Sequence, residues 1–254
     1  MKKAIPNKKS LFGVDYTIGD YDSIGDYIVE AARTNTSIGV SALAVHGLME
    51  SQDNLELKEA LKNIEIITPD GQPVRWALNF FHKSGLKDRV YGPKLTWEVL
   101  KKANSHKLSL YLYGSTEETI KGFIEKINLE LPDLKITGFH VDRFREATEA
   151  EDEQDIKKIN MSKPNLVLVG RGCPRQEIWV GNHVGKIYAP MLAVGAAFNF
   201  HAGNLKQAPV ILQNAGLEWA FRLCMEPKRL WKRYFYTNSR FILKIFKNLI
   251  LCRK

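Results

Sequence analysis

The feature that most constrains the fold is an alternation of short apolar runs with longer amphipathic segments between residues 38 and 194. Apolar runs of this length, bounded by turn residues, are typical of buried strands, and the segments between them have helical spacing. We predict strands at 38–43, 64–68, 108–113, 134–139, 165–169 and 187–194. Strands separated by helices favour a mostly parallel, Rossmann-like α/β sheet with helices on both faces. Ligands of such sheets bind beyond the carboxyl ends of the strands.

Local signals place helices between these strands. The apolar spacing predicts one helix over 45–62 and a polar-faced helix over 149–161. Ser115 and Glu118 are spaced as a capping box that opens a helix reaching about residue 129. Pro174 suits the first turn of a further helix. The pair Gly114-Ser115 could also cradle a phosphate, but Glu117 and Glu118 would repel it, so we interpret this segment as a cap.

Positive charge is concentrated at the end of the chain. The 254 residues carry a net charge of +9, and the last 50 of them contain eleven basic and two acidic residues, so the first 204 residues are balanced. The pattern there becomes purely helical, with a helix beginning near Pro227. We therefore expect an α/β catalytic domain at 1–204 and a basic helical appendage at 205–254 that meets an anionic partner.

Two apolar stripes run along this last helix. One comprises Leu230, Tyr234, Phe241, Ile245 and Leu249, and the other comprises Trp231, Phe235, Ile242, Phe246 and Ile250. A basic helix with an aromatic-rich face suits a membrane interface. An ordinary amphipathic helix packed on the body has the same pattern. The stripes alone leave both interpretations open.

Composition excludes several other classes of protein. No apolar run is long enough to span a bilayer, and no hydrophobic signal region follows Met1, so we expect a soluble or peripheral protein. Cys173, Cys224 and Cys252 are too far apart for a disulfide framework or a paired metal site, which favours a reducing compartment. The six histidines are scattered, and His46 and His201 are interpreted as structural. No zinc site is predicted.

Two segments could carry chemistry. Asp70 follows a predicted strand in the turn Pro69-Asp70-Gly71, where a carboxylate is well placed for general-base work, although Asp-Gly is also common in plain turns. Gly170 and Gly172 precede a predicted helix, as in phosphate-binding loops. A dinucleotide fingerprint would need a third glycine where Arg175 stands, and no Walker lysine is present. The glycine pair with Arg175 and Gln176 could still hold a uridine diphosphate.

The spacing Asp20-Tyr21-Asp22 is the one that many metal-dependent sugar transferases use for a divalent cation. No strongly apolar strand precedes it, so we interpret it as a solvated turn. We predict no metal and no cofactor.

Five blocks occur in an order that resembles a known family, the WecB/TagA/CpsF glycosyltransferases (glycosyltransferase family 26). The resemblance covers roughly residues 13–241. The blocks are Thr68-Pro69-Asp70-Gly71-Gln72-Pro73, Arg89-Val90-Tyr91-Gly92-Pro93, the segment Val169-Gly170 to Glu177, the segment Val194-Gly195 to Gly203, and the segment Gly216-Leu217-Glu218-Trp219 to Arg229.

The resemblance implies a function. Members transfer a sugar with inversion, and without a metal, from a UDP-sugar to an undecaprenyl-diphosphate-linked saccharide in exopolysaccharide or cell-surface polymer biosynthesis. It also implies roles: Asp70 as base with Ser41 near the donor; Arg89, Gly170, Gly172, Arg175, Gln176 and Glu177 as donor-binding residues; and Arg222, Arg229, Lys232 and Arg233 as residues that close over the lipid diphosphate. The expected location is cytoplasmic, peripheral on the inner face of the cell membrane.

Three departures from the family pattern stand out. Arg171 replaces the usual leucine between the glycines, Arg175 stands where lysine is common, and the loop at 140–145 lacks a proline pair. Two rival functions fit weaker signals: a nucleotide-binding oxidoreductase, from the glycine loop, and a nucleic-acid-binding protein, from the basic aromatic tail. We expect no nucleic acid partner. The sugar, the acceptor saccharide, the polymer and any homo-oligomer are left open.

Overall fold

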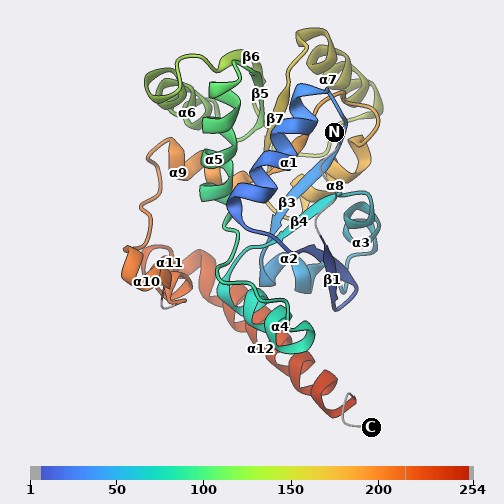
Figure 1. The fold of residues 1–254 in the computed structure, drawn as a ribbon, viewed down its shortest axis with the longest axis vertical. Helices are drawn as coiled ribbons and strands as arrows, with labels where there is room; N and C mark the ends of the chain where they lie inside the picture. The colour runs from blue at the N-terminus through green and yellow to red at the C-terminus, as the bar shows by residue number, and fades with distance from the viewer. Residues whose placement is uncertain (1–6, 215, 252–254) are drawn as a thin grey trace.

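The computed structural model describes residues 7–214 and 216–251, and these residues form an α/β fold around a six-stranded sheet (Figure 1). The strands lie in the order β4-β3-β8-β7-β5-β6, and every neighbouring pair is parallel. The strands are β3 (Gly39–Leu43), β4 (Ile66–Pro69), β5 (Ser109–Gly114), β6 (Lys135–His140), β7 (Leu166–Gly170) and β8 (Met191–Ala193). The predicted fold class is confirmed, and all six predicted strands are present, although β8 is shorter than expected.

Helices cover both faces of the sheet because successive side chains of each strand point to opposite sides. In β5, Leu110 and Leu112 are buried in one hydrophobic core, and Tyr111 and Tyr113 are buried in the other. The first core is covered by α1 (Tyr21–Arg33), α5 (Gly92–Ser105), α6 (Glu117–Glu130) and α9 (Gly195–His201). The second is covered by α2 (Val45–Glu50), α3 (Leu55–Lys62), α4 (Gln72–His82), α7 (Glu149–Ser162) and α8 (Arg175–His183).

Several local predictions are corrected. The helix expected over 45–62 is two helices, α2 and α3, because Asn54 caps α3 by accepting a hydrogen bond from the backbone N–H of Leu57 at 2.9 Å. The capping box at Ser115 is wrong: Thr116 caps α6, and Ser115 lies in a turn with a φ of 68°. Asp20 is solvent-exposed, as expected, and it is the N-cap of α1.

Some helices and one hairpin of the structure were not predicted from the sequence. Helices α1, α4 and α5 were not predicted, nor was the antiparallel hairpin of β1 (Lys8–Leu11) and β2 (Val14–Thr17). The hairpin joins the second core, where Leu11, Val14 and Tyr16 are buried.

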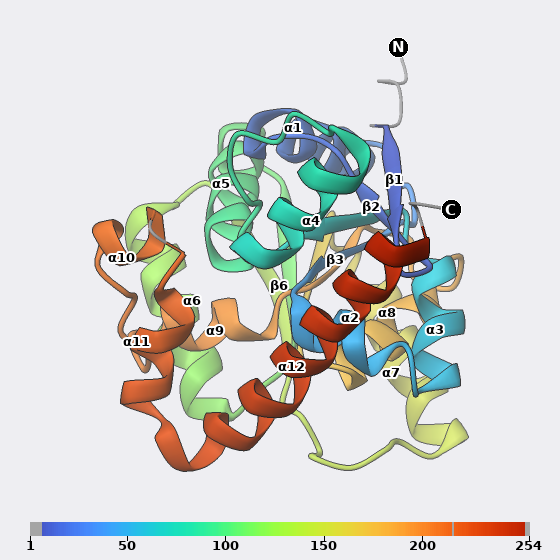
Figure 2. The ribbon, with the colours of Figure 1, turned by 90° about the horizontal axis from the view of Figure 1, so that it is seen from below.

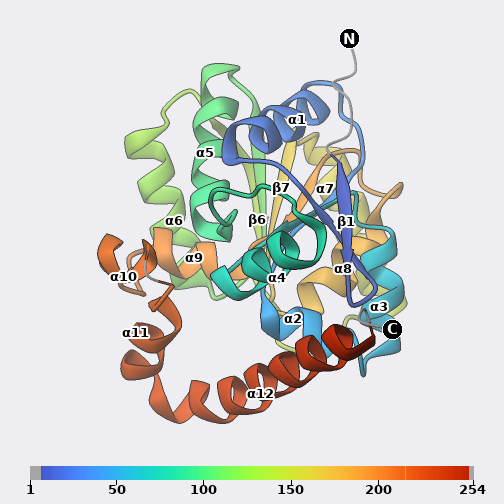
Figure 3. The same cartoon turned by 60° about the horizontal axis from the view of Figure 1, so that its bottom comes forward.

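The C-terminal region is helical, as predicted. It contains α10 (Val210–Asn214), α11 (Glu218–Met225) and α12 (Pro227–Leu251). We refer to α11 and α12 as the arm. Figures 2 and 3 show that α12 crosses one end of the sheet fold and passes α2, on which it packs. None of the described helices is long and apolar enough to cross a bilayer.

The two apolar stripes of α12 have different environments. In the first stripe, Leu230 and Phe241 are buried, and the ring of Phe241 lies edge-on to Phe12 at 5.9 Å. All five residues of the second stripe are more than half exposed: Trp231, Phe235, Ile242, Phe246 and Ile250. Packing on the body therefore accounts for the first stripe, and the second is an apolar surface open to a partner.

Candidate active site

A cavity of about 180 Å³ lies at the carboxyl ends of β3 and β4, between the sheet fold and the arm. Its inner wall is formed by residues 44–46, which follow β3, residues 70–73, which follow β4, and by Arg89 and Tyr91. Its outer wall is formed by side chains from the segment 216–238. The site is therefore at the sheet edge where ligands of parallel α/β proteins bind.

Asp70 is half-buried and faces this cavity. It directly follows β4, and Gly71 after it has a φ of 105°, a left-handed conformation that favours glycine and turns the chain into α4. Burial raises the pKa of Asp70 to about 7; nearby Glu218 acts in the same direction, and Arg89 and Arg222 oppose it. A carboxyl group that exchanges its proton near neutral pH is suited to act as a general base.

Arg89 connects the sheet fold to the arm. Its Nη2 donates a charge-assisted hydrogen bond to Oε2 of Glu218 at the start of α11, and both side chains are 9% exposed. The guanidinium also lies over the ring of Tyr91, 4.4 Å from the ring centroid. A buried ion pair depends on its partner, because removing one charge leaves the other uncompensated in a poorly solvated place.

Two further arginines reach the cavity from the arm. Arg222 of α11 and Arg233 of α12 line it, and Arg222 also lies over the ring of Phe200 at 5.8 Å. Together with Arg89 they bring three guanidinium groups to a space that Asp70 faces. Guanidinium groups bind phosphates with paired hydrogen bonds, so the cavity is suited to diphosphates.

The cavity also contains neutral polar groups. Burial and nearby Arg233 lower the pKa of His46 to about 4, so its imidazole is neutral at pH 7. His46 Nδ1 and Gln72 Oε1 are buried and have no hydrogen-bond partner within the described part of the chain. Buried polar atoms are normally paired, so a ligand that enters here finds groups ready to bind hydroxyls.

The other two predicted cationic residues are placed differently. Lys232 is exposed, outside the cavity lining, with its ammonium 5.6 Å from the ring centroid of Trp231. The side chain of Arg229 lies outside the described residues.

Ser41, Gln176 and Glu177 form a buried network next to the site and do not line the cavity. Ser41 Oγ and Gln176 Nε2 both donate to Oε1 of Glu177, at 3.3 and 2.9 Å. Burial raises the pKa of Glu177 to about 7. The network ties β3 to the start of α8.

The glycine loop after β7 is separated from the cavity by one strand, since β8 lies between β7 and β3. A Cβ on Gly170 would approach the ring of Phe198 to 2.8 Å, so packing alone requires this glycine. The backbone N–H of Gly172 donates to Oε1 of Gln176 at 3.1 Å. The backbone amide of Gly172 is therefore engaged in a hydrogen bond within the protein.

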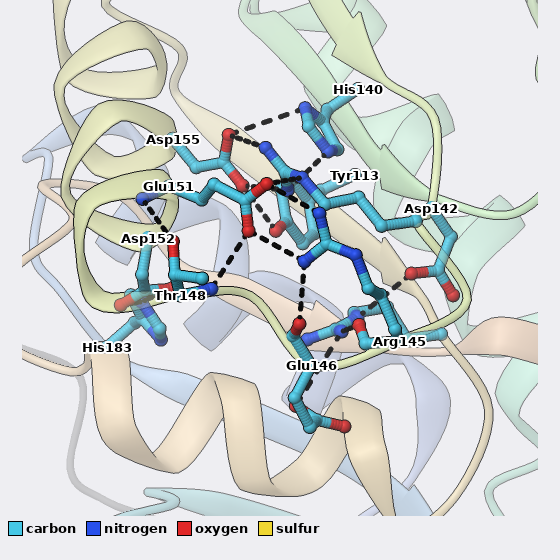
Figure 4. Close-up of polar contacts among 12 residues, drawn as sticks. Tyr113, His140, Asp142, Arg145, Glu146, Thr148, Glu151, Asp152, Asp155 and His183 are labelled. Atoms are coloured by element: carbon cyan, nitrogen blue, oxygen red, sulfur yellow. Dashed lines mark hydrogen bonds and ion pairs between the residues drawn. The ribbon is translucent and has the colours of Figure 1, made fainter.

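Arg175 is held in an ion-pair network by acidic residues of the loop 141–148. Figure 4 labels the two acceptors of this loop, Asp142 and Glu146. Arg175 Nη1 donates to Asp142 at 3.0 Å and its Nε donates to Glu146 at 3.2 Å. Arg171 also pairs with Asp142, at 3.4 Å, and its side chain is buried. The two cations that depart from the family pattern are thus occupied by acidic side chains of this loop.

The rest of the loop is fastened in the same way. Arg143 binds Asp155 through two hydrogen bonds of 2.6 and 3.0 Å, and Tyr113 donates to the same carboxylate at 2.8 Å. Arg145 binds Glu151 at 2.6 Å on the outside (Figure 4). Ion pairs therefore fix the loop in which we noted the missing proline pair.

The two aspartates of the Asp-x-Asp spacing make structural contacts. Asp20 caps α1 by accepting from the N–H of Ser23 at 2.8 Å, and Asp22 pairs with Lys102. Within 7–214 and 216–251, no group of three or more His, Cys, Asp or Glu side chains is arranged to hold a metal ion.

Sequence reasoning missed several residues of the cavity. Three of them lie inside the motif blocks: Gln72, Tyr91 and Glu218. Their position in these blocks was a signal that could have identified them, but roles were given only to their neighbours. His46 was interpreted as structural, because a lone histidine has no pattern that separates the two roles.

Comparisons with known proteins agree with the motif blocks. The profile of the family described as "Glycosyl transferase WecG/TagA/CpsF family" matches residues 9–254. A protein of Bacillus subtilis (strain 168) is 32% identical over 176 residues, which cover 69% of this chain and 66% of that protein. One of Bacillus spizizenii is 30% identical over 186 residues (72% and 69%), and one of Staphylococcus aureus (strain MW2) is 30% identical over 173 (68% and 66%).

All three carry the name N-acetylglucosaminyldiphosphoundecaprenol N-acetyl-beta-D-mannosaminyltransferase. The matched segments span about two thirds of these relatives' own lengths. The family match extends over nearly the whole chain and confirms the resemblance. The chain belongs to the WecG/TagA/CpsF family of glycosyltransferases.

Proposed function

We propose that this glycosyltransferase moves a sugar from a UDP-sugar to a saccharide on undecaprenyl diphosphate, with inversion and without a metal, in bacterial cell-surface polymer or exopolysaccharide synthesis. One observation carries the proposal: a carboxyl group with a pKa of about 7, that of Asp70, faces a cavity into which Arg89, Arg222 and Arg233 project. The relatives' names describe transfer of N-acetylmannosamine to a lipid-linked N-acetylglucosamine. An N-acetylhexosamine is accordingly the sugar that we propose for this chain.

The chemistry follows from the charges. Asp70 takes the proton of the acceptor hydroxyl while the oxygen of that hydroxyl bonds to C1 of the donor sugar. The bond from C1 to the UDP oxygen breaks. Attack from the side opposite the leaving phosphate inverts the configuration at C1. UDP departs with the bonding electrons, and the guanidinium of Arg89 offsets its negative charge. Arg222 and Arg233 are assigned to the acceptor diphosphate.

The donor needs more room than this conformation provides. Small-molecule sites are usually about 300–1,000 Å³, and the cavity has about 180 Å³. We infer that the arm moves outward to admit substrates and that a diphosphate then replaces Glu218 beside Arg89. Closure of the arm would exclude water and limit hydrolysis of the donor.

The nucleotide would extend toward the loop of Gly170 and Gly172, across the end of β8 from the cavity. There Gln176, Glu177 and Ser41 act as positioning residues in this proposal, and Arg175 would leave Asp142 to reach the donor. Arg229 and Lys232 are assigned to the lipid diphosphate or to the membrane surface. The donor's KM in the alanine variants tests the roles of Gln176, Glu177, Ser41 and Arg175. The acceptor's KM tests those of Arg229 and Lys232.

We propose further that residues 205–254 act as a membrane-associating appendage that holds the enzyme on the cytoplasmic face. The exposed second stripe of α12 and exposed Lys228 and Lys232 support this assignment. A basic residue near anionic lipid contributes about 1 kcal/mol. Deleting 205–254 should release the protein from anionic vesicles and reduce transfer to a lipid acceptor.

The decisive experiment incubates the protein with UDP-sugars and an N-acetylglucosaminyl-diphosphate lipid, and reads the product by mass. We expect one added N-acetylhexosamine, and the same yield with a chelator. A product that forms only with added manganese would exclude the metal-free mechanism. Binding of a nicotinamide cofactor, with no transfer from any UDP-sugar, would favour an oxidoreductase instead.

A further inference from the structure

A second cavity, of about 490 Å³, lies between α4 and α12 and is almost wholly apolar. We call it the α4–α12 groove. Its lining includes Trp76, Phe80 and Phe81 of α4, and Phe241, Ile242 and Ile245 of α12. Its two sides thus come from the sheet fold and from the arm.

Large apolar side chains that line the groove are exposed to solvent. Trp76 is 50% exposed, Phe80 65% and Ile242 52%. Exposed apolar side chains that gather in one concave place mark a binding surface, because covering them removes apolar area from water.

The groove continues from the active-site cavity. Pro73, Trp219 and Asn238 line both spaces, so one begins where the other ends. Trp219 and Arg222 are three residues apart on α11 and share a helix face. The guanidinium of Arg222, which is assigned to a diphosphate, is therefore on the helix face that leads to the apolar surface.

We propose that the α4–α12 groove binds the first isoprene units of the acceptor lipid. The inference rests on the proposed function and adds to it the subsite for the hydrocarbon tail. The acceptor presents a sugar hydroxyl, then a diphosphate, then a hydrocarbon chain. On the protein, Asp70, Arg222 and Arg233 line one cavity, and the apolar groove adjoins that cavity through Pro73, Trp219 and Asn238.

The groove also explains how the enzyme would select a lipid-linked diphosphate over a free nucleotide, which the cavity alone does not. A cavity lined by arginines binds any diphosphate, and free nucleotides would compete with the lipid. An adjoining apolar surface adds affinity only for a diphosphate with a hydrocarbon tail. The arm would then close on the lipid as well as on the sugar, since α12 forms one side of the groove.

The test uses two acceptors with the same sugar-diphosphate head, one with three isoprene units and one with a methyl group, below the micelle concentration and without membranes. We expect kcat/KM to favour the isoprenoid acceptor at least about tenfold in the natural protein, as burial of several methylene groups implies. Phe80→Ser should bring the ratio of the two values close to one. Phe80→Leu, which keeps an apolar side chain, should restore most of it.

Leu129→Ser is the matched control, since Leu129 is 82% exposed on α6 and remote in sequence from both groove helices. It should leave the ratio unchanged. A natural protein that does not distinguish the two acceptors would overturn the proposal. So would a preference that appears only when vesicles are added and persists in Phe80→Ser, because the membrane would then provide it.

A direct titration separates this inference from the proposed function. Farnesyl diphosphate is added to the protein, and the tryptophan emission, to which Trp76 and Trp219 of the groove contribute, is followed against the same titration with methyl diphosphate. Binding that depends on the tail and weakens in Phe80→Ser supports the groove even if no sugar is transferred. Equal binding of both compounds would exclude it even if transfer occurs.

Discussion

Arg89 of the sheet fold is paired with Glu218 of the arm, 129 residues further along the chain, at the wall of the cavity that Asp70 faces. The pair holds the arm over the site. The carboxylate of Glu218 carries a negative charge, as does the diphosphate that the proposed reaction places beside Arg89. One guanidinium can thus fasten the arm through Glu218 or bind the donor diphosphate. Exchange between these partners would couple arm movement to donor binding.

Replacing Glu218 by glutamine should therefore strengthen UDP binding. The variant keeps the shape of the side chain and removes the negative charge that occupies Arg89. We expect the Kd for UDP, measured by calorimetry, to fall about three- to tenfold, which corresponds to roughly 1 kcal/mol. Glu56→Gln, an exposed change on α3, should have no effect. A Kd that stays the same or rises would show that Glu218 does not compete with the diphosphate.

Asp70→Asn should abolish transfer while UDP still binds. The amide is close in size to the carboxyl group but cannot accept the acceptor's proton, so we expect kcat to fall about 10²–10⁴-fold. The Kd for UDP should change little, which calorimetry on the same preparation can check. Asp133→Asn, at an exposed position after α6, is the control. Substantial turnover in Asp70→Asn would mean that another group is the base.

The pH profile should have an acidic limb near pH 7. Only the deprotonated form of Asp70 can act as base, and burial raises its pKa to about 7, so kcat/KM should rise with pH up to that value and then level off. Glu218 contributes to the raised pKa. The limb should consequently move to lower pH in Glu218→Gln. A profile that is flat between pH 5 and 8 in the natural enzyme would contradict this assignment.

The fold was predictable because its signals are local. Each strand is a short apolar run, and Asp70 stands in a turn directly after one of them, so its place at the carboxyl edge of the sheet follows from parallel topology. The pairing of Arg89 with Glu218 was not predictable, because no local pattern connects two residues that far apart. The same limit explains why Arg175 could be assigned to a phosphate, although acidic residues of the 141–148 loop hold it.

Glu177 should make the protein less stable as the pH rises. Burial raises its pKa to about 7, well above the ordinary value of 4.5, so the folded state holds this proton more tightly than the unfolded state. Its contribution to stability is full below about pH 4 and is lost as the pH rises through 7. In Glu177→Gln, the fall in melting temperature between pH 5 and pH 8 should be smaller than in the natural protein. An unchanged difference would mean that other groups cause it.

The two stripes of α12 should respond differently to the same kind of substitution. Phe241 is buried against Phe12, so Phe241→Ala should destabilise the fold by about 3–5 kcal/mol, measured by urea unfolding. Phe246 is 59% exposed, and Phe246→Ala should leave the free energy of unfolding within about 0.5 kcal/mol. If the exposed stripe meets the membrane, Phe246→Ala should nevertheless reduce flotation with anionic vesicles. Equal flotation of Phe246→Ala and the natural protein would leave the basic residues of the arm, rather than this apolar surface, as the source of any membrane binding.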